Sequence, residues 1–317
     1  MELPARPRGQ AVAVAGAAFP WALSGTLLAT ALAVYVGRRG SPLAVSLLWT
    51  GFSAAVIVFA PVWGAVADAT GRRRGVLLVA AAGAGLSVPL LALNESVWLP
   101  LSVRTLHAAF FAGFLPVLTA VVSGRGGDGG RGQALGTFNA YIAAGAAAGT
   151  ALAGLLLEAL APAQLYLAIT AAVAVAALAV TRVEDSARVA ERSPSPRELL
   201  VEVRNRLLPG AEERGALREN GLVWLYVAVG FGQVTALGLL SLLPVYFTGP
   251  LGLSEAVMGA LVALNPALQT PVMHWLGGVA DRVGRRPLVV AGAATEGAFA
   301  LAAAGAAFLA GPARLLG

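Results

Sequence analysis

Cysteine and lysine are both absent from the 317 residues, and there are only two histidines, His107 and His274. Without cysteine the chain can form no disulfide, no thiolate metal site and no thiol nucleophile. The two histidines lie far apart in the sequence, and no glycine-rich phosphate loop follows a strand and opens a helix. These absences argue against an enzyme, and we expect neither a metal ion nor a cofactor.

Charge is also scarce, since charged residues make up 12% of the chain and apolar residues 58%. A soluble domain carries about 25% charged residues, so this chain must meet lipid on most of its surface. The net charge of +6 is compatible with nucleic-acid binding, but the arginines lie in short segments beside apolar runs. We therefore expect the lipid bilayer as the main partner and no nucleic acid.

Nine apolar segments are long enough to cross a bilayer, whose ~30 Å core requires roughly 20 apolar residues. They lie near residues 11–36, 42–67, 75–93, 97–123, 133–157, 162–181, 221–247, 254–280 and 287–310. The first segment is too long for the apolar core of a signal peptide. The sequence thus predicts an all-α polytopic membrane protein.

The arginines predict the orientation of these spans. With the N-terminus inside, the inner segments hold 18 of the 22 basic residues and the outer loops hold two, Arg38 and Arg39. Because basic residues gather on the cytoplasmic side of a membrane protein, we predict a multi-pass protein of the cell membrane with a cytoplasmic N-terminus.

One long polar segment, residues 182–220, contains eight arginines and eight acidic residues. Six predicted spans precede it and three follow it. We therefore predict an N-terminal six-helix bundle at 1–181, a cytoplasmic linker at 182–220 and a C-terminal bundle at 221–317. Residues 197–208 of the linker form either an amphipathic helix on the inner membrane surface or part of a solvated connection.

A short pattern, G-x-x-x-D-x-x-G-R-R, occurs twice in the chain, and the two copies align without a gap. Each copy is a polar turn between two predicted spans. Ser41 and Ser254 lie equally far before the two aspartates, where a serine N-cap would begin the preceding helix. Equivalent helix-loop-helix units indicate a duplicated membrane protein. The residues of the two copies are Gly64, Asp68, Gly71, Arg72 and Arg73, and Gly277, Asp281, Arg282, Gly284, Arg285 and Arg286.

This duplicated loop resembles the signature loop of the major facilitator superfamily, in particular its multidrug-efflux-like proton antiporters. The resemblance implies two six-helix halves around a central cavity, with the loop carboxylates latching the halves together at the inner face. The first copy has Ala69 where the family usually has a basic residue. By family geometry Asp281 should approach the start of the fifth span, near Arg131–Gln133. A basic loop that only fixes membrane orientation is the alternative.

Two residues of the fourth predicted span match another signature of the family, R-x-x-Q/H-G, at Arg104 and His107. The resemblance implies proton coupling or cavity shaping for this pair, whereas snorkelling of Arg104 to the outer headgroups is the alternative. The family geometry also implies that cavity-lining residues include Trp21, Asn139 and Gln233.

The fifth predicted span carries glycines at 136, 145, 149 and 154, which resemble the antiporter signature G-x8-G-x3-G-P-x2-G-G. The signature proline is replaced by Thr150. The resemblance implies export, while close packing of small residues is the alternative explanation. The residues concerned are Gly136, Gly145, Gly149 and Gly154.

The resemblance as a whole implies a secondary active transporter that moves a small organic molecule by alternating access. Proton-coupled export is the expected activity, with protons and an unidentified small-molecule substrate as partners. The alternatives are an uptake symporter and a non-transporting remnant or scaffold. Because the family has twelve spans, we expect a C-terminally truncated chain whose residues 221–317 form an incomplete, open-sided bundle.

Overall fold

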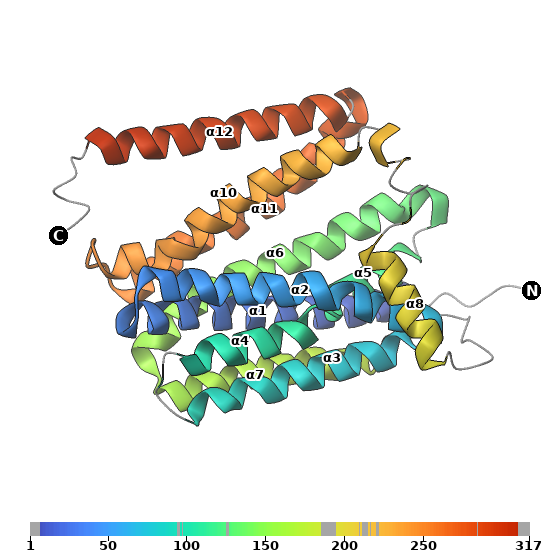
Figure 1. Ribbon diagram of the computed structural model, residues 1–317, viewed down its shortest axis with the longest axis horizontal. Helices are drawn as coiled ribbons and strands as arrows, with labels where there is room; N and C mark the ends of the chain where they lie inside the picture. Colours follow the sequence, from blue (N-terminus) through green and yellow to red (C-terminus); the bar gives the residue numbers. More distant parts are fainter. Residues whose placement is uncertain are drawn as a thin grey trace, which may run out of the picture.

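The computed structural model describes residues 7–93, 96, 98–124, 127–184, 195–208, 210, 215, 217–219, 222–283 and 285–309. Each element in these ranges is a helix, which confirms the predicted all-α fold, and α8 lies across one end of the others (Figure 1). The elements are α1 (Pro7–Arg39), α2 (Pro42–Thr70), α3 (Arg73–Ser87), the 3-10 helix η1 (Val88–Ala92), α4 (Trp98–Phe111), α5 (Phe114–Ser123), α6 (Gly127–Ala159), α7 (Pro162–Val180), α8 (Pro196–Leu207), α10 (Leu222–Thr248), α11 (Glu255–Val283) and α12 (Arg285–Leu309).

Helix α2 begins and ends on local signals in the sequence. The Ser41 hydroxyl accepts a hydrogen bond from the Ala44 N–H at 3.3 Å, and Pro42 occupies the first turn, where a missing N–H costs nothing. The helix ends at Gly71, whose φ of 67° lies in the left-handed region that favours glycine. The second motif glycine is therefore required by the turn.

Helix α11 repeats this arrangement. Its first and last residues, Glu255 and Val283, follow the corresponding ends of α2 by the same offset that separates the two copies of the sequence pattern. The Ser254 hydroxyl accepts a hydrogen bond from the Val257 N–H at 3.3 Å. The sequence repeat is thus also a repeat of helix boundaries, as expected for a duplicated unit.

Two predicted spans are interrupted rather than continuous. The third changes from α-helix to the 3-10 helix η1 next to Pro89, which lacks a backbone N–H. The fourth breaks between α4 and α5 at Gly113, where an added Cβ would lie 2.5 Å from the Trp63 ring. Trp63 also donates from Nε1 to the Ala109 carbonyl at 2.7 Å. A tryptophan from α2 therefore occupies the break.

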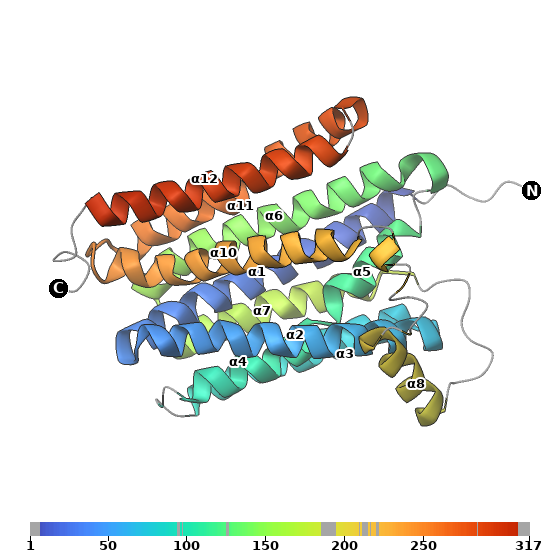
Figure 2. The same cartoon turned by 45° about the horizontal axis from the view of Figure 1, so that its top comes forward.

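In the group of helices α1 to α7, helix α1 is central, and it packs mainly against α6 and α7. Trp21, Leu28 and Leu32 of α1 are fully buried in two apolar clusters at the centre of this group. Helices α10, α11 and α12 lie on the side formed by α1 and α6 (Figure 2). This contact joins the first six predicted spans to the last three.

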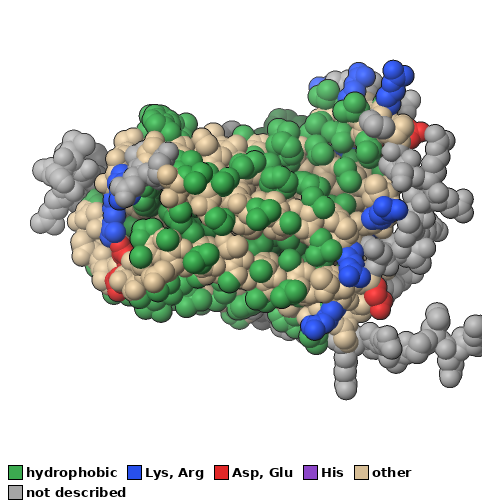
Figure 3. All heavy atoms as spheres, turned by 90° about the horizontal axis from the view of Figure 1, so that it is seen from below, with side chains coloured by type: hydrophobic (Ala, Val, Ile, Leu, Met, Phe, Trp, Pro, Cys, Tyr) green, Lys and Arg blue, Asp and Glu red, His purple; other side chains and the backbone are tan. Residues whose placement is uncertain are grey.

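Apolar side chains cover the surface between the two ends of the molecule, and charged side chains gather at the ends (Figure 3). Within the described ranges, six helices have the length and hydropathy to cross a membrane. Helices α10, α11 and α12 occupy the other three predicted spans, and a total of nine stays a prediction. Below, the motif end is the end that carries residues 64–74, and the opposite end carries Arg38 and Arg39.

Candidate functional site

A cavity of about 200 Å³ lies where α1, α2, α6, α10 and α11 meet. It therefore lies between the first group of helices and the last. Alanine, leucine, valine and proline side chains form most of its wall, and the described lining includes no charged residue. The polar lining residues are Thr26, Thr30, Trp49, Thr150, Ser241 and Asn265.

The polar groups of this cavity are mostly hydrogen-bond acceptors. Thr26 donates its hydroxyl proton to the Ala22 carbonyl of its own helix at 3.0 Å and also lies 3.1 Å from the Ala146 carbonyl. Thr150 donates to Ala146 and Ser241 donates to Gly238, both at 2.9 Å. Their oxygens remain able to accept from a ligand. Trp49 differs, because its buried Nε1 has no hydrogen-bond partner among the described residues. The cavity suits a small, mainly apolar molecule that can donate a hydrogen bond to one of these hydroxyl oxygens.

At the opposite end, polar contacts join the two groups of helices. Arg38 at the end of α1 forms an ion pair with Glu255 at the start of α11, and the Glu255 side chain is only 8% exposed. Glu158 of α6 accepts a hydrogen bond from the Ala256 N–H at 2.9 Å. A carboxylate at the first turn of α11 also complements the helix dipole. These contacts join α1 and α6 to α11 between the cavity and the opposite end.

Glycines allow α6 and α11 to approach closely beside these contacts. A Cβ added to Gly259 would lie 2.9 Å from the Gly154 Cα, and a Cβ added to Gly154 would overlap the Glu255 carbonyl. Because the obstructing atoms are backbone, no side-chain rearrangement relieves this overlap. Gly154 and Gly259 therefore set the separation of the two helices.

The other glycines of α6 have different surroundings. Gly145 and Gly149 lie against the α1 backbone, where an added Cβ would overlap the carbonyls of Phe19 and Leu23. Gly136 has no atom within 4 Å of an added Cβ. Close packing thus explains three of the four predicted glycines, and only Gly154 lies at the contact between α6 and α11.

At the motif end, Asp68 contacts the linker helix α8. Its carboxylate accepts a hydrogen bond from Arg206 of α8 at 3.1 Å and lies 3.6 Å from Arg73. Arg206 also pairs with Glu202 one turn away at 2.9 Å. A Cβ added to Gly64 would lie 3.0 Å from the Arg206 guanidinium, so the lack of a side chain at Gly64 leaves room for that group.

These charges are partly exposed, which limits their strength. The Asp68 and Arg206 side chains are 50% and 32% exposed, and such pairs contribute roughly 0.2–1 kcal/mol. Burial lowers the pKa of Arg206, but its hydrogen bonds to Glu202 and Asp68 outweigh this effect and raise the pKa above its ordinary value. Arg206 therefore stays charged, and α8 is held to α2 by a modest electrostatic contact.

The remaining motif positions are only partly described. Arg72 precedes α3, where its N–H donates to the Thr70 hydroxyl at 3.3 Å, and the Arg286 side chain is exposed. The predicted contact between Asp281 and the start of α6 lies outside the described side chains. The same holds for the surroundings of Gly277, Arg282, Gly284 and Arg285.

Arg104 is deeply buried in α4, with 3% of its surface exposed. Its guanidinium lies over the Phe52 ring at 4.1 Å from the centroid, and Nη1 has no hydrogen-bond partner among the described residues. The burial contradicts the snorkelling alternative, because Arg104 does not reach the surface. Phe52 in turn packs against Trp49, with ring centroids 6.2 Å apart, and Trp49 lines the cavity whereas Arg104 is not among its described lining residues.

His107 lies one turn after Arg104 and is fully buried. Its Nδ1 is 3.2 Å from both the Ser87 hydroxyl and the Ala84 carbonyl. Because Ser87 donates its own proton to Ala84, this geometry fits a proton on Nδ1 of His107. Nε2 then accepts, and it has no partner in the described part of the chain. Arg104 and His107 thus hold an unused donor and an unused acceptor.

The three expected cavity residues are not found in the described lining. Trp21 is fully buried between Phe111 and Phe114, with ring centroids 4.7 and 3.9 Å away, and therefore packs in the core. Asn139 is exposed on α6, and the Gln233 side chain lies outside the description. The threonines of α1 could have been found from their spacing, since Thr26 and Thr30 lie about one turn apart on one helix face.

Several known proteins are similar to this chain. The crystal structure of the human organic anion transporter MFSD10 (TETRAN) superposes with a TM-score of 0.62 at 20% identity, covering 88% of this chain and 74% of that one. A multi-drug resistance efflux pump PmrA homolog of Lactococcus lactis is 35% identical over 120 residues, which are 38% of this chain and 29% of that protein. Multidrug resistance protein MdtG of Yersinia enterocolitica is 32% identical over 149 residues, or 45% and 34% of the two chains.

The matched segments thus span about a third of the length of each of these two relatives. The match to the family as a whole is much longer. The family model described as Major Facilitator Superfamily covers residues 11–316, which include the duplicated loop, the cavity and the contacts at both ends. This chain is a multi-pass membrane protein that belongs to the major facilitator superfamily of transporters.

Proposed function

We propose that this protein is a secondary active transporter that exports a small, mainly apolar organic molecule in exchange for protons. The observation that carries the proposal is the cavity between two groups of helices, which meet towards one end at Arg38, Glu255 and Gly154. A site enclosed between two bodies that separate at alternate ends is what alternating access requires.

The proposed orientation places the motif end in the cytoplasm, because most arginines belong to segments at that end. The end that carries Arg38 and Glu255 then faces outward. The contact of Asp68 with Arg206 supports a role for the motif in holding the cytoplasmic end. In this chain that contact involves the linker helix α8.

Export is supported by two observations. Gly154, at the end of the antiporter-like glycine pattern, lies at the contact between α6 and α11. The two curated relatives are named as multidrug efflux or resistance proteins, and we extend export to this chain on that basis. The apolar, uncharged lining of the cavity fits a substrate that dissolves in the membrane.

Arg104 and His107 are the proposed coupling residues. A buried cation with an unused donor is costly in a membrane and is normally retained for function. The Nε2 of His107 has no hydrogen-bond partner in the described part of the chain and belongs to a residue one turn from the buried Arg104, and we assign proton uptake to this atom. Proton uptake by His107 would therefore alter the interior of the α1–α7 group and couple it to movement.

Proteoliposomes with an imposed pH gradient test this function. We expect proton-driven movement of a hydrophobic dye such as Hoechst 33342, and collapse of that movement when the gradient is removed. Ser241→Phe fills the cavity and should abolish transport, whereas Leu301→Ala, at a side chain 76% exposed on α12, should not. Dye movement that needs no gradient refutes proton coupling, and an unaffected Ser241→Phe variant refutes the assigned cavity.

A further inference from the structure

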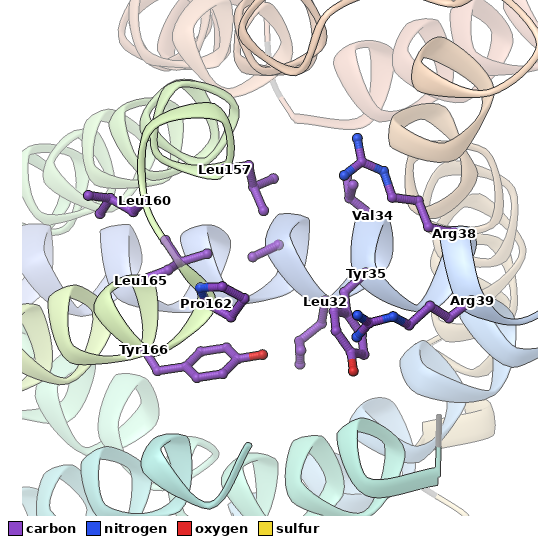
Figure 4. A pocket seen from close by; sticks show the side chains of 11 residues that line it. Leu32, Val34, Tyr35, Arg38, Arg39, Leu157, Leu160, Pro162, Leu165 and Tyr166 are labelled. Carbon is purple, nitrogen blue, oxygen red and sulfur yellow. The ribbon is translucent and has the colours of Figure 1, made fainter. Parts of the chain in front are cut away.

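A second pocket, of about 210 Å³, lies at the opposite end of the molecule, away from the transport cavity. The end of α1 forms one wall, and the end of α6 with the start of α7 forms the other (Figure 4). The transport proposal assigns no role to this pocket. Its lining combines two arginines, two tyrosines and a group of leucines.

One side of the pocket is positively charged, although basic residues are rare in the predicted outer loops. Arg38 and Arg39 are the two basic residues that the sequence places in the predicted outer loops, and both line this pocket. The Arg39 guanidinium lies over the Tyr35 ring at 4.3 Å from its centroid. Guanidinium groups present paired donors that match the geometry of phosphate and carboxylate groups. This side of the pocket is therefore suited to an anionic head.

The other side of the pocket is apolar. Leu157, Leu160 and Leu165 lie across the pocket from the arginines, as Figure 4 shows. Tyr166 is 6% exposed, and its hydroxyl points into the pocket, where it can donate a hydrogen bond. A ligand that satisfies both sides must carry a negative head and an apolar tail.

We propose that this pocket binds an anionic amphiphile, with a phosphate or carboxylate held by Arg38, Arg39 and the Tyr166 hydroxyl. The apolar chain lies against the leucines of α6 and α7. Such a molecule comes either from a phospholipid of the adjacent leaflet or from a soluble amphiphile. Binding itself does not depend on the proposed transport function.

Occupancy of the pocket also acts on the closure of the opposite end. Arg38 lines the pocket and at the same time pairs with Glu255 of α11. An anionic head competes with Glu255 for that guanidinium and so weakens the link between α1 and α11. The amphiphile therefore favours opening at this end, a consequence that rests on the proposed alternating access.

Calorimetric titration of the purified full chain in phosphatidylcholine nanodiscs tests the site. Octyl phosphate should bind, whereas inorganic phosphate, which lacks the tail, and octyl glucoside, which lacks the charge, should bind at least about tenfold more weakly. Arg39→Gln should raise the Kd for octyl phosphate about tenfold, and Tyr166→Phe should raise it several-fold. Arg286→Gln removes an exposed arginine at the other end and should leave the Kd unchanged.

Equal affinity of wild type and Arg39→Gln, or equal loss in Arg286→Gln, overturns the site. Native mass spectrometry from mixed nanodiscs distinguishes the two sources. Retention of phosphatidylglycerol over phosphatidylcholine, lost in Arg39→Gln, identifies a phospholipid. Binding of octyl phosphate without such retention identifies a soluble amphiphile. Failure of both the binding and the retention refutes the proposal.

The link to the closure is measured separately. Because the chain has no native cysteine, Leu43→Cys and Leu251→Cys supply a unique pair of spin labels at exposed positions of the opposite end. Octyl phosphate should lengthen the distance between the labels. Binding without any change in distance leaves the site intact and overturns its coupling to opening.

Discussion

Replacing Gly154 by alanine should open the opposite end of the molecule. The added Cβ overlaps the backbone at the start of α11, where Gly259 also lies within contact distance. Overpacking of this kind costs typically about 1–3 kcal/mol. The cost applies only to the state in which α6 and α11 touch, because the overlap disappears when they separate. A shift of about 1–3 kcal/mol changes the ratio of the two states by roughly 5- to 150-fold.

The assay is the reactivity of a single cysteine in the cavity. Ser241→Cys, at a lining position that is 6% exposed, is treated with a membrane-impermeant maleimide from the side of the opposite end. Gly154→Ala should raise the labelling rate by a factor within that range. Labelling at the wild-type rate would show that the glycine contact does not hold this end closed.

Gly136→Ala is the matched control, because it makes the same change in the same helix. Among the described residues, no atom outside its own helix turn lies within 4 Å of its added Cβ, so no overpacking against a neighbouring helix is expected. Both substitutions increase the intrinsic helix propensity of α6 by about 1 kcal/mol, and this effect cancels in the comparison. An equal increase in labelling in both variants would refute the steric argument.

Three further predictions concern the motif end, the buried pair and the cavity. In a double-mutant cycle on thermal unfolding, Asp68→Asn and Arg206→Gln should show a coupling of less than about 1 kcal/mol, with Arg204→Gln as the uncoupled control; a coupling several times larger would contradict the partly exposed geometry. Arg104→Leu should keep or raise the unfolding temperature, because it removes a buried charge that has no described ion-pair partner, yet abolish proton-driven transport while substrate exchange without a gradient persists. Loss of both activities would indicate a structural role instead. Ser241→Ala removes a cavity hydroxyl whose oxygen can accept from a ligand and should weaken binding of dyes with a donor group about 5- to 10-fold, with little effect on pure hydrocarbons.

The helices could be predicted from sequence because their signals are local. Runs of apolar residues gave the spans, and the serines at 41 and 254 marked the starts of α2 and α11 to the residue. The left-handed turn at Gly71 follows equally from a short pattern. The break between α4 and α5 could not be predicted, because it depends on Trp63, which belongs to α2 and lies far from the break in the sequence.

The candidate site was less predictable, because it too depends on contacts between residues that lie far apart in the sequence. A threonine or serine in a membrane span bonds to its own helix wherever it points, so the sequence does not distinguish Thr26 or Ser241 from a packing residue. Trp21 was expected in the cavity but stacks between two phenylalanines in the core. The partner of Asp68 was also unpredictable, because Arg206 lies far along the chain in a linker with many arginines.

The two copies of the duplicated unit make different contacts at the equivalent first residues of α2 and α11. The first residue of α2 is Pro42, which is well suited to the first turn of a helix and has an uncharged side chain. In α11 the equivalent residue is Glu255, which pairs with Arg38, while the next N–H is bound by Glu158. One orphan N–H at the start of α11 is thus bound by a carboxylate of α6, while the Glu255 side chain pairs with α1, and both contacts cross the boundary between the two groups. The position that only begins a helix in one copy joins the two groups of helices in the other.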